Sequence, residues 1–422
     1  MKRFHGEIRM TKGIKSLRGI FGEADDTNEI ICSECVQEPF LIEHMIVPVS
    51  VLRACIGCGK TVNRAFISGA IASLCRTTLE TYFEIDHGIY PGYELSLVDV
   101  LRRALYCNNV TALESVASLL EVEGSGDDES DQFFSLGQEY RRKSSPFDDE
   151  EHERWYVLGD WHTVANQLTH GRRFFNQSAQ VLFHGIVREA LSAEDHIVPG
   201  LRPVVKKVPE GSEYFRARVS RNFKERQSFC SFPTEHLGAL PKEVAANNRM
   251  SAAGIPHLYL SADLRTCVAE VRPSIGDEVV VGKFTTTKNH IIFDLTAFSR
   301  QFNHKPISFF DPSHEERHLL RLLLSHLHVE LGRPVKIHDT DYVMTQALAE
   351  YIRFECGEKF DGIAFESVQN SGGVNYMLFD SGTDEEQGWP DWKPKFNVQI
   401  SSSNVSVVKI SALSYSMTDL AP

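Results

Sequence analysis

Two pairs of cysteines near the start of the sequence have the spacing of metal ligands. Cys32 and Cys35 form one Cys-x-x-Cys pair, and Cys55 and Cys58 form a second pair a short distance along the chain. Thiolates on two such tight turns are typical of tetrahedral zinc sites. Because four cysteine ligands leave no coordination position open, we expect a structural zinc that supports folding and takes no part in catalysis.

A second motif that could bind a metal lies much later in the chain, at His314-Glu-Glu-Arg-His318. On a helix, the pattern His-Glu-x-x-His places two imidazoles on one face, where they could hold zinc while Glu315 acts as a base. Here both middle positions carry charged side chains, and residues 311–313 have the composition of an ordinary helix start. We therefore favour a solvated helix face over a metalloprotease site.

An isolated acidic residue, Glu270, interrupts an apolar run between Thr266 and Arg272. A carboxylate in apolar surroundings is costly unless it has a partner or a function. The ordinary explanation is an ion pair with Arg272, and the alternative is a role in a binding site. Arg216 and Arg218 share one face of an expected strand, and guanidinium groups bind phosphate oxygens with paired hydrogen bonds.

These residues belong to a series of short segments that resembles the RES domain family. The family is named for an Arg, a Glu and a Ser, which occur here in that order, each at the end of a short apolar run. The resemblance covers about residues 213–380 and implies a fold similar to that of ADP-ribosyl-transferring toxins, with NAD as substrate. The segments that carry it are Tyr214-Phe-Arg-Ala-Arg218, Arg249-Met-Ser-Ala-Ala-Gly254, Leu258-Tyr-Leu-Ser-Ala262, Val268-Ala-Glu-Val271, Phe360-Asp-Gly-Ile-Ala-Phe-Glu-Ser367 and Gly372-Gly-Val-Asn-Tyr-Met-Leu-Phe379.

The resemblance also implies roles for individual residues in the cleavage of the nicotinamide–ribose bond. Such cleavage passes through an oxocarbenium-like transition state, and nicotinamide leaves as a neutral molecule, so no general acid is required. The catalytic candidates are Arg216 for the diphosphate, Glu270 for the ribose cation and Ser367 for a hydrogen bond to the ribose or a phosphate. The sequence does not separate Arg216 from Arg218 as the functional arginine. The candidates for substrate binding are Arg218, Arg249, Tyr259 and Asn375.

The front half of the chain resembles the HEPN-type amino-terminal domain that is fused to some RES domains. It opens with the two cysteine pairs and continues with helical patterning. HEPN ribonucleases carry an Arg that is closely followed by a His. In this sequence Arg154 and His162 are too far apart, and no Arg stands at the required distance before His170. The resemblance therefore implies a binding or regulatory module rather than a ribonuclease.

The composition is that of an ordinary soluble protein. The chain has 422 residues, of which 42% are hydrophobic and 24% charged, so we expect two domains. Its formal net charge of −13 disfavours general binding to nucleic acid or to an anionic membrane. No apolar run approaches the ~18 residues of a membrane span, and no signal peptide follows the basic start. We therefore expect a cytoplasmic protein with reduced thiols.

The elements that must position these residues change in character along the chain. Helical spacing dominates residues 62–123 and 155–193, with an acidic Gly/Ser-rich loop at 124–131 between them. The expected fold is therefore α+β: a helical amino-terminal domain with a small zinc-binding element, followed by an ADP-ribosyltransferase-like mixed α/β domain. In the back half, β-rich runs occupy residues 278–284, 290–295, 362–365 and 374–379, and helical runs occupy residues 313–331 and 342–353.

The domain boundaries are expected from the composition of the connecting segments. Three prolines between residues 198 and 209 mark the segment that we expect to link the two domains. The expected divisions are a lead-in at 1–30, the zinc-knuckle and helical domain at 31–200, the linker at 201–212, the RES domain at 213–385 and a tail at 386–422.

The resemblance implies a toxin or defence effector that consumes NAD. It would act as an NAD glycohydrolase or phosphorylase, cleaving the nicotinamide–ribose bond by hydrolysis or phosphorolysis. The alternatives are an ADP-ribosyltransferase that modifies a macromolecule, and a catalytically inactive, zinc-stabilised interaction protein. RES toxins are commonly neutralised by a protein partner, so the resemblance also implies an antitoxin or regulatory protein; assembly into a homo-oligomer stays open. Membranes and nucleic acids are not expected as partners.

Overall fold

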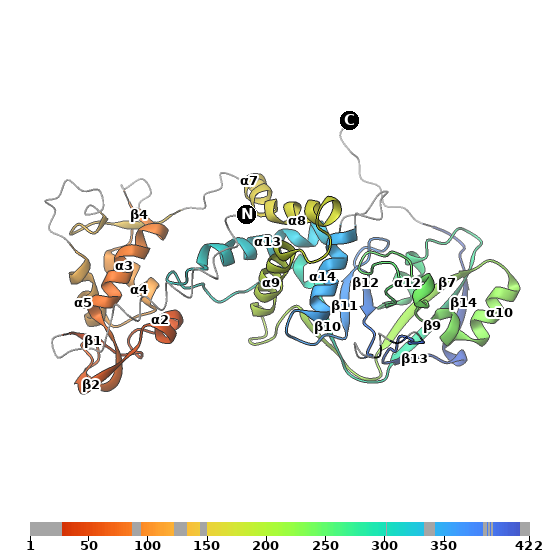
Figure 1. Cartoon of the computed structure of the whole chain (residues 1–422), viewed down its shortest axis with the longest axis horizontal. Helices are drawn as coiled ribbons and strands as arrows, with labels where there is room; N and C mark the ends of the chain where they lie inside the picture. The colour runs from red at the N-terminus through yellow and green to blue at the C-terminus, as the bar shows by residue number, and fades with distance from the viewer. Residues whose placement is uncertain are drawn as a thin grey trace. The chain divides into compact units, whose positions relative to one another are not determined.

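The computed structural model describes residues 28–86, 94–121, 133–143, 150–300, 302–332, 342–382 and 391–413, with residues 386 and 389. The expected acidic loop at 124–131, and the expected lead-in except for residues 28–30, lie outside this part of the chain. The chain divides into two compact units, whose elements are labelled in Figure 1. The first unit comprises Met1–Glu153 and Pro306–His318, and the second comprises Arg154–Lys305 and Leu319–Pro422.

A small antiparallel sheet lies at the start of the first unit. Its strands are β1 (Ile30–Ile31), β2 (Val47–Ala54) and β3 (Thr61–Ile67), in the order β1-β3-β2. The expectation of helix from residue 62 is wrong for residues 62–67, because this segment pairs with a strand on each side. The other elements of the unit are α2 (Pro39–His44), α3 (Ser68–Tyr82), β4 (Phe83–Ile85), α4 (Leu97–Leu105), α5 (Val110–Leu120) and β5 (Tyr140–Arg142).

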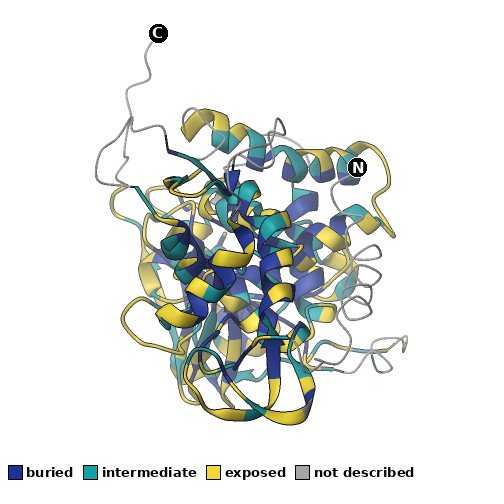
Figure 2. Cartoon of the chain, turned by 90° about the vertical axis from the view of Figure 1, so that its left-hand side faces the viewer, coloured by how far each residue is buried: buried dark blue, intermediate teal, exposed yellow. Residues whose placement is uncertain are grey.

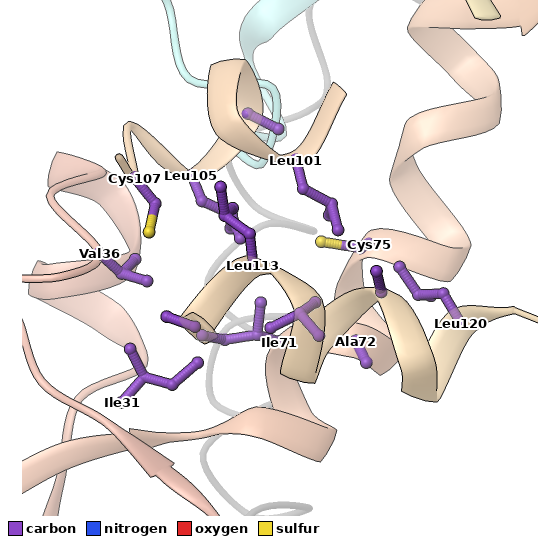
Figure 3. Packing of buried hydrophobic residues seen from close by; sticks show 14 of the residues in the cluster. Ile31, Val36, Ile71, Ala72, Cys75, Leu101, Leu105, Cys107, Leu113 and Leu120 are labelled. Carbon is purple, nitrogen blue, oxygen red and sulfur yellow. The ribbon is translucent and has the colours of Figure 1, made fainter. Parts of the chain in front are cut away.

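The core of the first unit forms where α3, α4 and α5 pack together. Helix α5 contacts both α3 and α4, and each of the three buries one apolar face. Burial of such faces is what stabilises short helices in water. Figure 3 labels ten of the buried side chains: Ile31, Val36, Ile71, Ala72, Cys75, Leu101, Leu105, Cys107, Leu113 and Leu120.

The second unit contains a group of helices that pack on one another. Helices α8 (Gly159–His170) and α9 (Gln177–Ser192) both contact α14 (Val343–Phe354). The ring of Phe183 on α9 lies 6.1 Å from that of Tyr351 on α14, and His184 Nδ1 lies 3.1 Å from the Tyr351 hydroxyl. The helical pattern expected for residues 155–193 is therefore confirmed. Two further helices, α7 (Glu150–Val157) and α13 (His314–Gly332), begin in the first unit and end in the second.

A large sheet forms the centre of the second unit. Among the described residues its strands run in the order β13-β9-β7-β8-β12-β11-β10-β6, and β14 also pairs with β9. The pairing of β10 with β11 is parallel, and the other pairings are antiparallel. The strands are β6 (Val205–Val208), β7 (Glu213–Ser220), β8 (Leu258–Ser261), β9 (Glu278–Thr286), β10 (His290–Asp294), β11 (Gly362–Glu366), β12 (Val374–Leu378), β13 (Val398–Gln399) and β14 (Val405–Lys409).

The segment expected to link two domains contributes to this sheet. Val205–Val208 form β6, which pairs antiparallel with β10, so residues 201–212 lie inside the second unit. The strands at 278–284, 290–295, 362–365 and 374–379 and the helices at 313–331 and 342–353 are found close to where the sequence pattern predicts them. The remaining helices of the unit are α10 (Phe223–Ser231), α11 (Pro233–Leu237) and α12 (Leu264–Glu270).

The architecture as a whole is mixed α/β, with a cluster of cysteines near the amino terminus. Figure 2 shows that helices carry both buried and exposed residues along their length, as amphipathic helices do. Within the described residues, no helix has the length and apolar character that a membrane crossing requires.

Candidate functional site

A cavity of about 390 Å³ in the second unit brings most of the predicted site residues together. Its walls come from β7, β8, the end of α12, β11, β12 and a loop at residues 247–249. A cavity of this size is within the usual range for small-molecule sites. Five of the predicted residues line it: Arg216, Arg249, Tyr259, Glu270 and Asn375.

The carboxylate of Glu270 is held on one side only. Two donors reach the same oxygen, Oε1: the hydroxyl of Ser367 and the side-chain N–H of Asn375, each at 2.6 Å. Ser261 in turn donates to the Asn375 carbonyl at 2.7 Å, which orients the amide so that its N–H₂ group faces Glu270. Among the described residues Glu270 forms no ion pair with Arg272, so this simple explanation for its charge does not apply. No hydrogen bond to the second oxygen, Oε2, is found among the described residues, so this oxygen can accept one from a ligand in the cavity.

Ser367 supports Glu270 and does not itself line the cavity. Its side chain is buried, and its oxygen accepts hydrogen bonds from the backbone N–H groups of Gln369 and Asn370 at 3.2 and 3.1 Å. Because its single hydrogen is donated to Glu270, the hydroxyl has none left for a substrate. Ser367 thus contacts Glu270 in the structure, and its direct hydrogen bond to the ribose or a phosphate stays a prediction.

The two arginines of β7 have different surroundings. Arg216 lines the cavity and donates to the backbone carbonyl of Tyr259 at 3.2 Å, whereas Arg218 is not among the lining residues. Burial, together with the nearby charge of Arg218, lowers the pKa of Arg216 to about 10, so the guanidinium is still protonated at neutral pH. Within the described part of the chain Arg216 makes no ion pair. A half-buried cation of this kind is suited to an anionic ligand.

Arg249 and Tyr259 approach the cavity from the side of β8. Burial lowers the pKa of Arg249, and the nearby Tyr342 and Glu270 act in the opposite direction. Burial raises the pKa of Tyr259, whose ring lies 6.5 Å from that of Phe365 in a T-shaped arrangement. The cavity thus combines three guanidinium groups, two carboxylates and aromatic rings, a set that matches an anionic ligand with planar rings.

Comparison with protein families agrees with this arrangement. Residues 218–400 match the RES domain. The matched segment contains Arg249, Tyr259, Glu270 and Ser367, and it begins two residues after Arg216. Curated proteins and solved structures give no significant match to the chain.

Several residues that line the cavity were not singled out by the sequence. Phe215 and Phe365 are strand residues, and their aromatic character alone does not distinguish a cavity wall from a core. Tyr342 begins a helix far along the chain, so only the fold brings it near Arg249. The additional polar lining residues are Asn247, Asn248, Arg272, Glu366 and Gln369.

The four paired cysteines come together in the first unit. Their Sγ atoms all lie within 4.8 Å of one another, and Cys32 Sγ is 3.6 Å from Cys58 Sγ. Cys55 Sγ is 3.8 Å from Cys35 Sγ. Sulfurs bound tetrahedrally to zinc at ~2.3 Å would be separated by about 3.8 Å. The cluster could therefore hold a metal ion.

The backbone around Cys55 favours its thiolate. Burial acts to raise the pKa of Cys55, but backbone N–H groups of Cys58, Cys32 and Gly57 outweigh this effect and lower the pKa to about 7. The N–H of Cys32 lies 3.2 Å from Cys55 Sγ. A Cβ at Gly57 would lie 2.9 Å from Asn109 Oδ1, so a glycine lets the second cysteine turn approach the start of α5 closely. The thiolate is the form that binds metals.

The other two motifs considered in the sequence have structural contacts. His314 Nδ1 lies 2.9 Å from the Ser308 carbonyl, and its ring lies 4.5 Å from that of Tyr82, while His318 is exposed. In the second unit, the carboxylate of Glu330 lies 3.6 Å from Arg154 and 3.8 Å from His162. These contacts connect α13 with α7 and α8.

Proposed function

We propose that the RES domain cleaves the bond between nicotinamide and ribose in NAD. The observation that carries this proposal is the placement of Glu270: one oxygen is fixed by Ser367 and Asn375, and the other is available in the cavity that Arg216 also lines. During the reaction the ribose becomes cationic while the diphosphate stays anionic. A fixed carboxylate and a half-buried guanidinium suit these two charges.

The expected reaction is a substitution at C1′ of the nicotinamide ribose. The electron pair of the C–N bond leaves with nicotinamide, and the free oxygen of Glu270 accepts a hydrogen bond from the ribose 2′-hydroxyl and steadies the sugar cation. Attack by water forms a new C–O bond, releases a proton and gives ADP-ribose. Attack by inorganic phosphate gives phosphorylated ADP-ribose instead. Arg216 and Arg249 would bind the diphosphate, and Tyr259 would stack near the nicotinamide.

The test is to incubate the full chain with NAD, with and without phosphate, and to separate the products by chromatography. Nicotinamide release supports the proposal. Recovery of ADP-ribose then indicates hydrolysis, phosphorylated ADP-ribose indicates phosphorolysis, and label retained on protein or nucleic acid indicates transfer to a macromolecule. The absence of nicotinamide release under all these conditions would contradict the proposal.

We further infer that the four-cysteine cluster binds a structural zinc ion. The sulfur separations support this inference. Elemental analysis should find one zinc per chain in the wild type and in a Cys230→Ser variant, whose cysteine is far from the cluster in sequence. Cys55→Ser should lose the metal and lower the melting temperature, because a site of this kind contributes directly to folding. Full zinc content in Cys55→Ser would contradict the inference.

The resemblance to NAD-degrading toxins supports a biological role as a toxin or defence effector. On this proposal, the helical front half is a HEPN-type binding or regulatory module, and an antitoxin or regulatory protein would control the enzyme. Expression of the wild type should deplete NAD and stop growth of a bacterial host, whereas expression of Glu270→Gln should not. Equal effects of the two proteins would contradict the role.

A further inference from the structure

The cavity residue Arg249 is carried by a tight turn that is closed on itself. Asn248 and Ser251 exchange backbone hydrogen bonds of 2.9 and 3.3 Å across the turn, and Arg249 and Met250 occupy the two positions between them. Met250 is buried, with 2% of its surface exposed. The side chain of Met250 therefore anchors the turn in the protein, and the preceding side chain, Arg249, lines the cavity.

Gln346, at the start of α14, is hydrogen-bonded to this turn at three points. Its Nε2 lies 2.7 Å from the side-chain oxygen of Asn247, 2.7 Å from the carbonyl oxygen of Asn248 and 3.1 Å from that of Ser251, so its two hydrogens are shared among three acceptors. All three acceptors belong to the segment that holds Arg249. A single amide group thus ties both ends of the turn to one helix.

The neighbouring residue on α14 contacts the turn at its centre. The hydroxyl of Thr345 lies within hydrogen-bonding distance of the backbone carbonyls of Arg249 and Tyr342, the latter at 3.0 Å, and its single hydrogen is shared between them. Thr345 is buried, whereas Gln346 is half-buried. The first turn of α14 therefore holds the carbonyls of residues 248, 249 and 251, which leaves little freedom in the position of the Arg249 backbone.

We propose that Gln346 and Thr345 are positioning residues of the NAD site, which act by fixing the Arg249 turn over the cavity. This inference rests on the proposed function, and it assigns a task to residues that do not line the cavity. Arg249 would bind the diphosphate in the ground state and in the transition state alike. Loosening its turn should therefore weaken substrate binding and leave the chemical step nearly unchanged, which is a rise in KM at constant kcat.

Replacement of Gln346 by glutamate shows whether Gln346 acts through the hydrogen bonds that it donates or only through the space that it fills. Glutamate has nearly the same size and shape, but at neutral pH its carboxylate accepts hydrogen bonds and donates none. In the full chain, Gln346→Glu should raise KM for NAD about tenfold and change kcat by less than about twofold. The amide hydrogens of residues 245–254 should also exchange faster with solvent. Thr345→Ser, which keeps the hydroxyl, should behave as the wild type does.

Gln227→Glu provides the matched control, because Gln227 is an exposed glutamine on α10. It adds the same charge and should alter neither KM nor the exchange of residues 245–254. Wild-type KM or wild-type exchange in Gln346→Glu would overturn the inference. Failure of the proposed function would be recognised by another result, because the wild type itself would then release no nicotinamide. Hydrogen exchange in Gln346→Glu would then still decide whether the turn is held by α14.

Discussion

At the scale of single residues, the negative charge of Glu270 is the feature on which the proposed reaction depends most directly. In Glu270→Gln, the remaining carbonyl oxygen can still accept from Ser367 and Asn375, so the fold of the site should persist. The negative charge that steadies the ribose cation is lost. We expect kcat for nicotinamide release to fall about 10²–10³-fold, as when one stabilising group of a preorganised site is removed. Single-turnover kinetics with saturating NAD measure this effect.

The control for this change is Glu355→Gln, which removes one negative charge from an exposed residue beyond the end of α14. Its kcat and melting temperature should equal those of the wild type. If Glu270→Gln retained the kcat of the wild type, the carboxylate would have no part in the reaction.

The two arginines of β7 form a natural pair for a second experiment. Arg216 lines the cavity and Arg218 does not, although they lie two residues apart on one strand. Arg216→Ala should raise KM for NAD about 10- to 100-fold, because a charge-assisted hydrogen bond to the diphosphate contributes about 1.5–3 kcal/mol. Arg218→Ala should change KM less than about threefold. Steady-state kinetics of the two variants measure these changes. A larger rise in KM for Arg218→Ala than for Arg216→Ala would mean that Arg218 is the functional arginine.

The sequence could nominate these residues but could not divide the tasks between them. Arg216 and Arg218 share one strand face, so residue type and spacing treat them alike. Ser367 was expected to contact substrate, and only the fold shows that its hydrogen is donated to Glu270. The position of Asn375 was easier to predict, because it lies on a strand whose β-rich pattern is clear in the sequence. Contacts between segments that are far apart in the chain could thus not be predicted from the sequence.

At the scale of elements, α12 carries Glu270 at its last position, and its first turn is capped by Asp263. The carboxylate of Asp263 accepts from the backbone N–H of Thr266 at 2.8 Å and from the Thr266 hydroxyl at 2.6 Å. The same hydroxyl accepts from Asn370 at 2.9 Å, which links the cap to the segment after Ser367. Asp263→Ala should therefore lower the free energy of unfolding by about 1 kcal/mol, measured by urea denaturation.

The cap also predicts how stability depends on pH. Burial acts to raise the pKa of Asp263, but the hydrogen bonds from Thr266 outweigh it and hold the pKa below its usual value. A carboxyl whose pKa is lower in the folded chain than in the unfolded chain stabilises the fold above about pH 4. This stabilisation is lost as the pH falls through the folded pKa. Asp263→Asn keeps a side chain that can cap the helix but cannot ionise. The difference in the free energy of unfolding between this variant and the wild type should therefore become smaller below about pH 4.

Elements were predictable where one apolar face or a β-rich run was long enough. The helices at 313–331 and 342–353 and the strands of the back half have such patterns. Residues 62–67 were misread because six residues with a few apolar positions fit a helix as well as a strand, and pairing with β1 and β2 decided between them. Glu270 breaks a local rule, since an acidic residue at the end of a helix is unfavourable for the helix dipole. Such exceptions are expected at functional sites.

At the scale of the whole molecule, the RES match leaves out a part of the second compact unit, at the start of that unit. The unit begins at Arg154, whereas the match begins at residue 218. Helices α8 and α9 lie in between, and both contact α14. Since α14 also holds the Arg249 turn through Gln346, these helices support the site from a distance. The enzyme would therefore require more of the chain than the family segment alone.

Two fragments test this requirement directly. A chain of residues 154–422 keeps α8 and α9, whereas a chain of residues 201–422 removes them and exposes Tyr351, which lies against Phe183 and His184. Both fragments lack residues 1–153, so any difference between them reports residues 154–200, which contain α8 and α9. We expect the longer fragment to release nicotinamide at nearly the rate of the full chain. The shorter one should unfold at a lower temperature and have a higher KM for NAD, because burial of apolar surface on α14 is lost. Equal melting temperatures and equal KM values would mean that the RES segment needs no support from α8 and α9.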